Sequence, residues 1–218
     1  MGLDGDVANL MFKNIFRLSG MLSFAPLRET VMPWPARQRP STRQRILDSA
    51  SRLFAIEGFE RVSIDMIMQD AGLTRGAFYS HFRSKTDLYN EAIGNAAKAG
   101  GALLEQAGVS GLKQVVETYL QMEHRDGSAM HCPLAFMIND AATQDAAIRD
   151  RYTQVFNGFL ARLETTLAKT HPNSSRQRAL QVATGMIGGV ALARAIADEQ
   201  LASELLDACQ AGCIELLR

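Results

Sequence analysis

The chain has 218 residues, of which 47% are hydrophobic, and its 23 Lys and Arg residues balance 23 Asp and Glu residues. This composition suffices for one large or two small packed domains, and the zero net charge argues against a protein that coats nucleic acid nonspecifically. Three cysteines, Cys132, Cys209 and Cys213, lack the number and spacing of a disulfide framework or a zinc site. We therefore expect no metal and no cofactor, and a reducing cytoplasm fits best.

The N-terminal segment resembles neither a membrane anchor nor a secretory signal. No uninterrupted apolar run reaches about 18 residues, so no membrane association is expected. Asp4 and Asp6 precede the apolar stretch 10–27, where a signal peptide carries positive charge. Three prolines between residues 33 and 40 prevent a helix there. Residues 1–40 are predicted to be an N-terminal tail and basic arm. This segment is either disordered or an over-extended start, in which case Met32 is the alternative first residue.

Helical periodicity begins after Ser41 or Thr42 and ends near Gly58. Ser63 can cap a second, short helix, because a serine side chain accepts a hydrogen bond from the free N–H groups of a first turn. Gly72 then supplies a turn. Two helices joined by a glycine-containing turn are therefore expected to follow the first helix closely.

The third helix is predicted to begin after Thr74 and to be brief, about 75–81. Ser84 and Asp87 form an S-x-x-D capping box, which opens a longer helix reaching to about Ala107. Phe78 and Phe82 lie four residues apart and are predicted to pack inward. The second and third helices thus have the layout that inserts a helix into the DNA major groove.

Charge and side-chain chemistry support a DNA-binding role for this segment. Residues 36–90 carry nine Lys and Arg against six Asp and Glu, a net charge of +3, whereas residues 91–218 carry eleven against fourteen, a net charge of −3. Arg75 can reach a guanine, and Gly76 and Ala77 allow the backbone to approach the bases. The candidate DNA contacts are Arg43, Ser63, Thr74, Arg75, Gly76, Ala77, Tyr79, His81 and Lys85. For Arg37, Arg39 and Arg43, a solvated arm and a phosphate or minor-groove contact stay equally open.

Beyond Gly111 the sequence predicts only helices, at about 111–123, 133–142, 145–170, 175–197 and 201–217. The last two have wide apolar faces, which suggests burial against a second copy of the chain in a four-helix bundle. The residues predicted for this interface are Met186, Gly189, Val190, Ala193, Leu205, Cys209 and Ile214. The glycines at 185, 188 and 189 indicate close helix approach.

Residues 46–93 resemble the N-terminal domain of the TetR family of repressors. The matching positions are Phe54, Gly58, Phe59, Ser63, Ile67, Ala71, Gly72, Leu73, Thr74, Arg75, Gly76, Phe78, Tyr79, His81, Phe82, Ser84, Lys85 and Leu88. Met68 departs from the family, which often has alanine there. The resemblance implies an all-α fold with a three-helix helix-turn-helix DNA-binding domain, 41–88, and a helical ligand-binding and dimerisation domain, 89–218. It also implies a homodimer that binds a palindromic double-stranded DNA operator and is released from it by a small-molecule inducer.

A ligand cavity in the second domain would draw on its aromatic, histidine and methionine residues, most of which are expected to be ordinary core. The candidates are Tyr119, Met122, His131, Cys132, Phe136, Tyr152 and Phe156, with His124, Met137 and Phe159 nearby. Cys132 is predicted to lie at a helix start, where a lowered thiol pKa would make a redox or electrophile sensor. A small buried hydrophobe is the alternative interpretation.

Two other functions are compatible with parts of the sequence. A helical enzyme could use His124, His131 or Cys132 as base or nucleophile, but it leaves residues 46–93 unexplained, and no GxSxG, HExxH or Walker-like loop supports it. We therefore expect no catalytic activity. An activator, or a regulator whose ligand strengthens DNA binding, fits the sequence as well as a repressor does.

Overall fold

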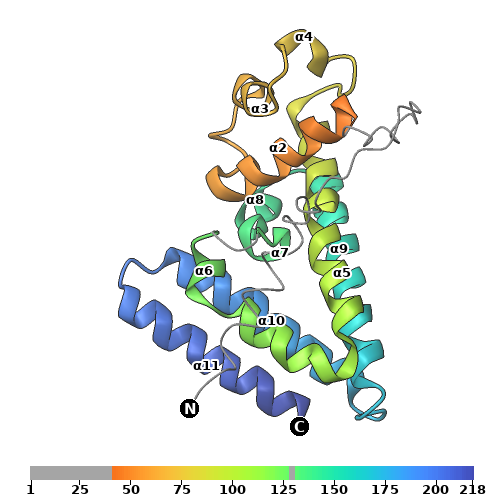
Figure 1. Cartoon of the computed structure of the whole chain (residues 1–218), viewed down its shortest axis with the longest axis vertical. Helices are drawn as coiled ribbons and strands as arrows, with labels where there is room; N and C mark the ends of the chain where they lie inside the picture. The colour runs from red at the N-terminus through yellow and green to blue at the C-terminus, as the bar shows by residue number, and fades with distance from the viewer. Residues whose placement is uncertain (1–40, 128–130) are drawn as a thin grey trace, which may run out of the picture. The chain divides into compact units, whose positions relative to one another are not determined.

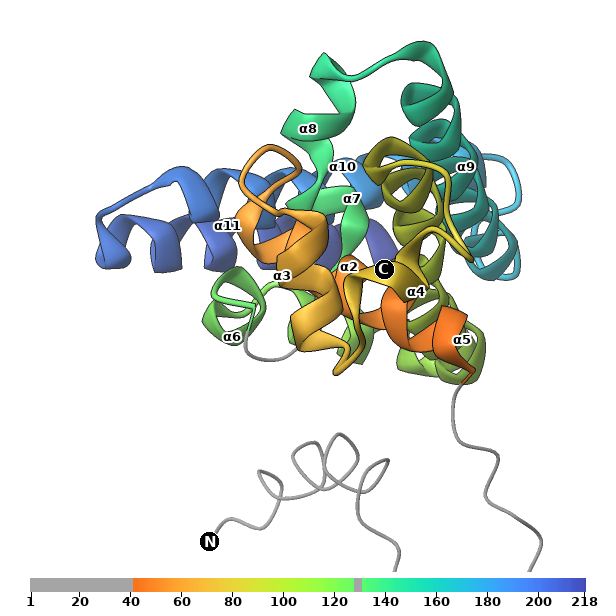
Figure 2. The ribbon, with the colours of Figure 1, turned by 90° about the horizontal axis from the view of Figure 1, so that it is seen from above.

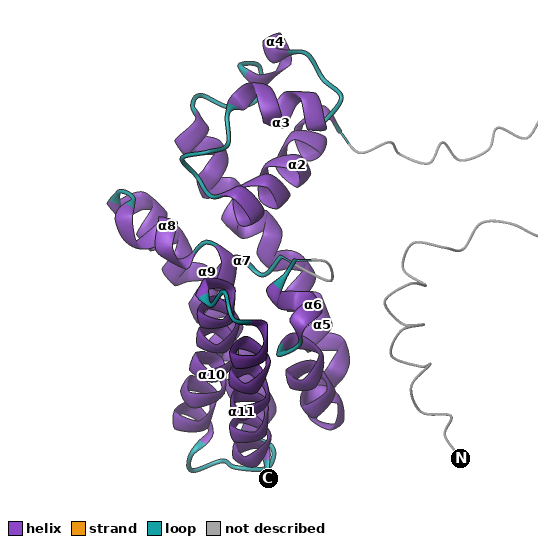
Figure 3. Ribbon diagram, turned by 90° about the vertical axis from the view of Figure 1, so that its left-hand side faces the viewer, coloured by secondary structure: helices purple, strands orange, loops and turns teal. Residues whose placement is uncertain are grey.

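A computed structural model describes residues 41–127 and 131–218, and every regular element in these ranges is a helix (Figures 1 and 3). The prediction for residues 1–40 lies outside the described residues. The helices are α2 (Thr42–Glu57), α3 (Ile64–Asp70), α4 (Arg75–Phe78), α5 (Lys85–Tyr119), α6 (Met122–Arg125), α7 (Pro133–Phe136), α8 (Ile138–Thr143), α9 (Ala146–Leu167), α10 (Ser175–Ala195) and α11 (Glu199–Leu217). The all-α prediction is confirmed. Within the ranges described, no helix has the length and apolar composition needed to cross a bilayer.

Serine side chains begin three of the N-terminal helices. The Oγ atoms of Ser41 and Ser63 accept hydrogen bonds of 3.2 Å from the third N–H of α2 and α3. Ser84 Oγ accepts a 3.0 Å hydrogen bond from the N–H of Asp87, and the Asp87 carboxylate accepts one from the N–H of Arg83. The predicted S-x-x-D pair therefore caps α5, with its return bond one residue earlier than in the standard capping box.

The turn between α3 and α4 depends on a glycine and on a distant arginine. Gly72 has φ +64°, a left-handed conformation that costs glycine little and other residues more. Arg45, on α2, donates a 2.5 Å hydrogen bond from Nη2 to the carbonyl oxygen of Ala71 and a 3.3 Å bond to that of Gly72. The guanidinium group of Arg45 thus links α2 to the turn that determines the orientation of α4.

Two hydrophobic clusters share the long helix α5. The N-terminal core consists of buried residues of α2 to α4 with their loops, residues 88–93 of α5, and Met137, Ala141 and Ile148. The C-terminal core consists of buried residues from the rest of α5 and from α7, α9, α10 and α11. The predicted domain boundary at residue 88 falls inside α5, so the two cores are joined by continuous helix and by the α7–α9 segment.

The structure refines several helix ends. The break predicted between residues 107 and 111 is a kink at Gly108, whose φ of 58° and ψ of −158° are not helical. The segment predicted as one helix, 133–142, is two short helices divided at Met137. The third helix is a single turn ending at Phe78, followed by a tight turn that brings the N–H of Phe82 within 3.0 Å of the Phe78 carbonyl oxygen.

The left-handed turn makes a testable prediction about stability. Gly72→Ala should lower the free energy of unfolding by about 1–2 kcal/mol, because an L side chain at φ +64° is strained and its Cβ would lie 3.1 Å from Nη2 of Arg45. Gly76→Ala is the matched control: its Cβ meets nothing within 4 Å, so stability should hold or rise by up to ~1 kcal/mol. Urea denaturation of both variants checks this, and equal effects would contradict the role given to Gly72.

Candidate functional site

The start of α4 presents an exposed polar surface above a buried aromatic base. Arg75 has 61% of its side chain exposed and Tyr79 is 59% exposed, whereas Phe78 is 0% and Phe82 3% exposed. Helices α3 and α4 lie at the end of the described chain opposite α10 and α11 (Figures 1 and 3), and in the view from above they lie with α2 nearest the viewer (Figure 2). The inward packing predicted for the two phenylalanines is confirmed.

Arg75 is held at this surface by polar neighbours. Its Nη1 donates a 2.8 Å hydrogen bond to Oδ2 of Asp65, which lies in the first turn of α3. Hydrogen bonding with Tyr79, followed by the charge of Asp65, raises the pKa of Arg75 above its ordinary value. The guanidinium group is therefore charged, and it lies at the exposed surface in contact with Asp65 of α3 and with Tyr79.

The small and hydroxylated residues beside Arg75 leave room for a ligand. A Cβ at Gly76 would meet nothing within 4 Å, so this side of α4 is open. Thr74 precedes α4 without a side-chain capping bond, and both Thr74 and His81 are exposed. Ala77 is partly covered because it packs on the N-terminal core. Apart from Ala77, the predicted contacts of the α4 region are brought together on one accessible surface.

The other three predicted DNA contacts also have partners within the chain. Ser63 caps α3. The Lys85 ammonium lies 4.3 Å from the ring centroid of Phe59 and donates a 3.4 Å hydrogen bond to the Glu60 carbonyl oxygen. Both groups lie in the loop between α2 and α3, so Lys85 fixes that loop to the start of α5.

Arg43 is similarly engaged. Its Nη2 donates to both carboxylate oxygens of Glu91 at 2.5 Å, and its guanidinium carbon lies 4.8 Å from the ring centroid of Phe82. This ion pair joins the start of α2 to α5, and the guanidinium group of Arg43 lies over the ring of Phe82 beneath α4. Sequence analysis also missed Arg45 and Asp65, because no local pattern marks a partner ten or more residues away.

A second group of polar side chains lies inside the C-terminal half. This interior polar cluster consists of Tyr119, His124, His131, Cys132 and Phe136. His124 is 1% exposed, and its Nδ1 lies 2.7 Å from the Tyr119 carbonyl oxygen. Because a carbonyl oxygen only accepts hydrogen bonds, Nδ1 carries the proton and Nε2 carries a lone pair. Burial lowers the pKa of His124 to about 4, against the hydrogen bond to Tyr119, which raises it.

Aromatic contacts hold this cluster together. The His124 ring packs edge-on against Tyr119 with centroids 4.2 Å apart, and it stacks on Phe136 with centroids 5.7 Å apart. His131 meets Phe136 edge-on, also at 5.7 Å. Among the residues described, Tyr119 Oη, His124 Nε2 and His131 Nε2 are buried without a hydrogen-bond partner. Buried polar atoms normally have one, so this unpaired group requires an explanation.

Cys132, a member of this cluster, immediately precedes α7 but lacks the chemistry of a thiolate. Burial raises the pKa of Cys132, and interactions with the Tyr119 side chain and with the backbone of α7 offset that only in part. The thiol therefore stays protonated near neutral pH, which favours the small-hydrophobe interpretation over the reactive sensor.

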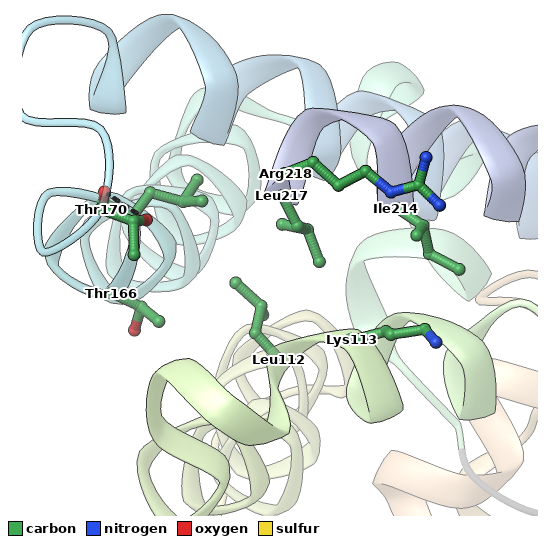
Figure 4. A pocket seen from close by; sticks show the side chains of 8 residues that line it. Leu112, Lys113, Thr166, Thr170, Ile214, Leu217 and Arg218 are labelled. Carbon is green, nitrogen blue, oxygen red and sulfur yellow. Dashed lines mark hydrogen bonds between the residues drawn. The ribbon is translucent and has the colours of Figure 1, made fainter.

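The remaining predicted pocket residues pack against the C-terminal core. Met122, Tyr152 and Phe156 are partly buried there, and the Tyr152 hydroxyl donates a 2.5 Å hydrogen bond to the Leu134 carbonyl oxygen. An open pocket of about 210 Å³ lies elsewhere, between α5, α9 and α11 (Figure 4). Its lining residues are Leu112, Lys113, Thr166, Leu167, Thr170, Ile214, Leu217 and Arg218. It is smaller than pockets that enclose drug-sized ligands, and only Ile214 belongs to a predicted site.

Four of the seven residues predicted for the dimer interface lie in the core of their own chain. Met186, Val190 and Ala193 are 0% exposed and belong to the C-terminal core of their own chain. Gly189 is buried too: a Cβ there would lie 2.9 Å from Leu120 and 3.1 Å from Cys209. The close helix approach expected from the glycines is confirmed at positions 185 and 189, where it occurs within the chain, but not at position 188, where a Cβ would meet nothing within 4 Å. The other predicted interface residues, Leu205, Cys209 and Ile214, are partly buried against the same core.

Taken together, the fold and the α4 surface define a helical protein with a helix-turn-helix at one end. The family model described as "Bacterial regulatory proteins, tetR family" matches residues 46–92. The HTH-type transcriptional regulator AcrR of Shigella flexneri is 52% identical over 50 residues, so that match spans 23% of either protein. The HTH-type transcriptional regulator SrpR of Pseudomonas putida is 27% identical over 165 residues, 71% of this chain and 76% of the relative.

Solved structures show the same fold over most of the chain. A TetR transcriptional regulator from Legionella pneumophila has a TM-score of 0.69 at 19% identity and covers 83% of this chain and 100% of its own. The reduced form of NemR from E. coli has a TM-score of 0.66 at 19% identity, covering 80% and 95%. Residues 46–92 therefore match the helix-turn-helix domain of TetR-family transcriptional regulators, and the rest of the described chain shares the fold of such regulators.

The buried His124 predicts a pH dependence of stability. In the unfolded chain its imidazole takes up a proton as the pH falls through about 6.5, whereas in the folded protein it does so only near 4. Stability is therefore fully present above pH ~6.5 and falls between these values, by a loss on the order of 3 kcal/mol. His124→Asn, whose amide can keep the bond to the Tyr119 carbonyl, should flatten this decline in urea titrations from pH 7 to 4. The exposed His81→Asn is the control, and an unchanged slope in His124→Asn would refute the assignment.

Proposed function

We propose that this chain is a homodimeric, cytoplasmic repressor that binds a palindromic DNA operator and leaves it when a small molecule binds in its C-terminal half. The observation that carries the proposal is the exposed Arg75 and Tyr79 on a one-turn helix whose underside, Phe78, is fully buried. Sequence relatives support repression. The probable acrEF/envCD operon repressor of E. coli K12 is 42% identical over 50 residues, which is 23% of that protein. The relatives of the present chain are named as transcriptional regulators, which favours a non-enzymatic role.

In this proposal α4 enters the major groove and Arg75 reads a base edge. The open side of Gly76 lets the backbone come close to the bases, and Ala77 offers its methyl group to a thymine. The exposed Thr74, Tyr79 and His81 donate to phosphates and so fix the register. Before binding, Arg75 forms an exposed ion pair with Asp65, which it exchanges for the base edge on the DNA.

The division between base reading and phosphate binding can be measured. Arg75→Ala should cost about 1–3 kcal/mol of operator affinity and relax the preference at one operator position. Lys85→Ala should weaken binding to all sequences by a similar factor. The substitution removes a positive charge, and it also removes the contacts of the Lys85 ammonium with Glu60 and Phe59 in the α2–α3 loop. Binding to a library of single-base operator variants, at stated salt, separates the two. Equal changes in sequence preference would contradict these roles.

The second protomer is proposed to cover the outer faces of α10 and α11. On α10, Leu180, Thr184 and Leu192 are exposed at helical spacing, and a Cβ at Gly188 between them would meet nothing within 4 Å. On α11, Leu201 is 51% exposed. These apolar and small residues form an unpartnered face next to the buried residues first predicted for the interface. A two-fold related copy supplies the self-complementary partner, and its second α4 reads the second half-site.

An acidic substitution tests this surface. Leu192→Asp, at a position 58% exposed in the single chain, should convert the dimer to monomer because it would bury an unpaired charge in the interface. Ile56→Asp on α2, at a position 44% exposed, is the matched control and should leave the dimer intact. Analytical ultracentrifugation gives the oligomeric state. A monomeric wild-type protein, or a dimeric Leu192→Asp variant, would overturn the proposed interface.

A further inference from the structure

We propose that Asp65 is a second base-reading residue, which accepts a hydrogen bond from the amino group of a cytosine after Arg75 has moved to its own base. This inference rests on the proposed DNA-binding function and adds a specificity-determining residue to it. It starts from one contact between the two helices of the helix-turn-helix, in which Nη1 of Arg75 donates to Oδ2 of Asp65 at 2.8 Å.

The position of Asp65 brings it to the DNA together with Arg75. Asp65 is the second residue of α3 and Arg75 is the first residue of α4, and their side chains are 60% and 61% exposed. Residues at the start of a recognition helix reach base edges in the major groove, where successive base pairs are about 3.4 Å apart. A carboxylate in contact with the Arg75 guanidinium group therefore lies within reach of the base pair that Arg75 reads, or of the next one.

The charge of Asp65 requires a new partner on the DNA. Among the ion pairs of residues 41–127 and 131–218, Asp65 takes part only in the one with Arg75. Two other acidic residues of this region have structural roles, because Asp70 pairs with Arg52 of α2 and Asp87 caps α5. When Arg75 leaves for a base, the Asp65 carboxylate is left beside negative phosphates without a donor, which is unfavourable. A donor on a base edge would offset that cost.

The chemistry of a carboxylate selects the base. A carboxylate only accepts hydrogen bonds, and the donors in the major groove are the amino groups on N4 of cytosine and N6 of adenine. Adenine also presents the acceptor N7 beside its amino group, where it would face the second oxygen of Asp65, whereas cytosine presents no acceptor there. Guanine and thymine present acceptors, which the carboxylate repels. Asp65 therefore favours cytosine on the strand next to it and acts largely by rejecting the other bases.

The experiment measures binding of the full chain to an operator selected from random-sequence DNA and to all its single-base variants, at one fixed salt concentration. The wild-type protein should prefer cytosine by about tenfold at one position of each half-site. Asp65→Ala should remove this preference, mainly through tighter binding to the wrong bases, because the repulsion is lost. Asp70→Ala removes the same charge from the same helix and is the matched control, which should leave all base preferences unchanged.

Asp65→Asn should give a result that a purely structural role of Asp65 does not predict. An asparagine amide accepts from N6 of adenine and donates to N7, so the preference at this position should move from cytosine to adenine. Unchanged base preferences in Asp65→Ala would overturn the inference. A retained cytosine preference in Asp65→Asn, or the same loss of preference in Asp70→Ala, would overturn it as well.

Arg75→Ala, measured on the same DNA variants, separates this inference from the proposed function. If Arg75→Ala relaxes one operator position and Asp65→Ala relaxes none, the DNA-binding function stands and the role of Asp65 fails. If the protein selects no sequence from random DNA, the proposed function fails and the inference fails with it.

Discussion

The exposed surface of α4 depends on the burial of Phe78 and Phe82 beneath it. A four-residue helix cannot persist through its own hydrogen bonds, because nucleation of a helical turn is unfavourable. Helix α4 is held instead by the aromatic residues beneath it, with Phe78 and Phe82 at a centroid distance of 5.8 Å. Arg45 fixes the preceding turn and Arg43 covers the Phe82 ring. With its underside occupied in this way, α4 can only present Arg75 and Tyr79 outward.

The link between the two ends of the chain is made by α7 and α8 as well as by α5. Asp140 on α8 accepts a 2.7 Å hydrogen bond from the N–H of Phe59 and a 3.4 Å hydrogen bond from the Tyr89 hydroxyl. Four residues earlier, Phe136 contacts His124, His131 and Arg194. One short segment therefore touches both the loop before α3 and the interior polar cluster. A displacement of α7 has a direct mechanical route to the helix-turn-helix.

The sequence predicts best what short-range chemistry determines. The caps at Ser63 and Ser84 and the left-handed Gly72 depend on neighbours within a few residues, and all three are found as expected. The sequence also predicts the wide apolar face of α10, but its residue pattern does not indicate which segment packs against that face. Met186 and Val190 are covered by the chain itself, because Gly185 and Gly189 let α11 approach closely. Long-range hydrogen bonds, such as the one from the Phe59 N–H to the Asp140 carboxylate, produce no local sequence pattern.

The interior cluster has an energetic consequence that an apolar core would not have. A buried polar atom without a partner is destabilising, and a hydrocarbon side chain of similar shape would avoid that penalty. In this chain the unpaired Nε2 of His124 and Oη of Tyr119 lie beside Phe136, where the two cores meet. The unpaired atoms therefore weaken the packing at the point where the two cores meet, and that junction is less stable than either core alone.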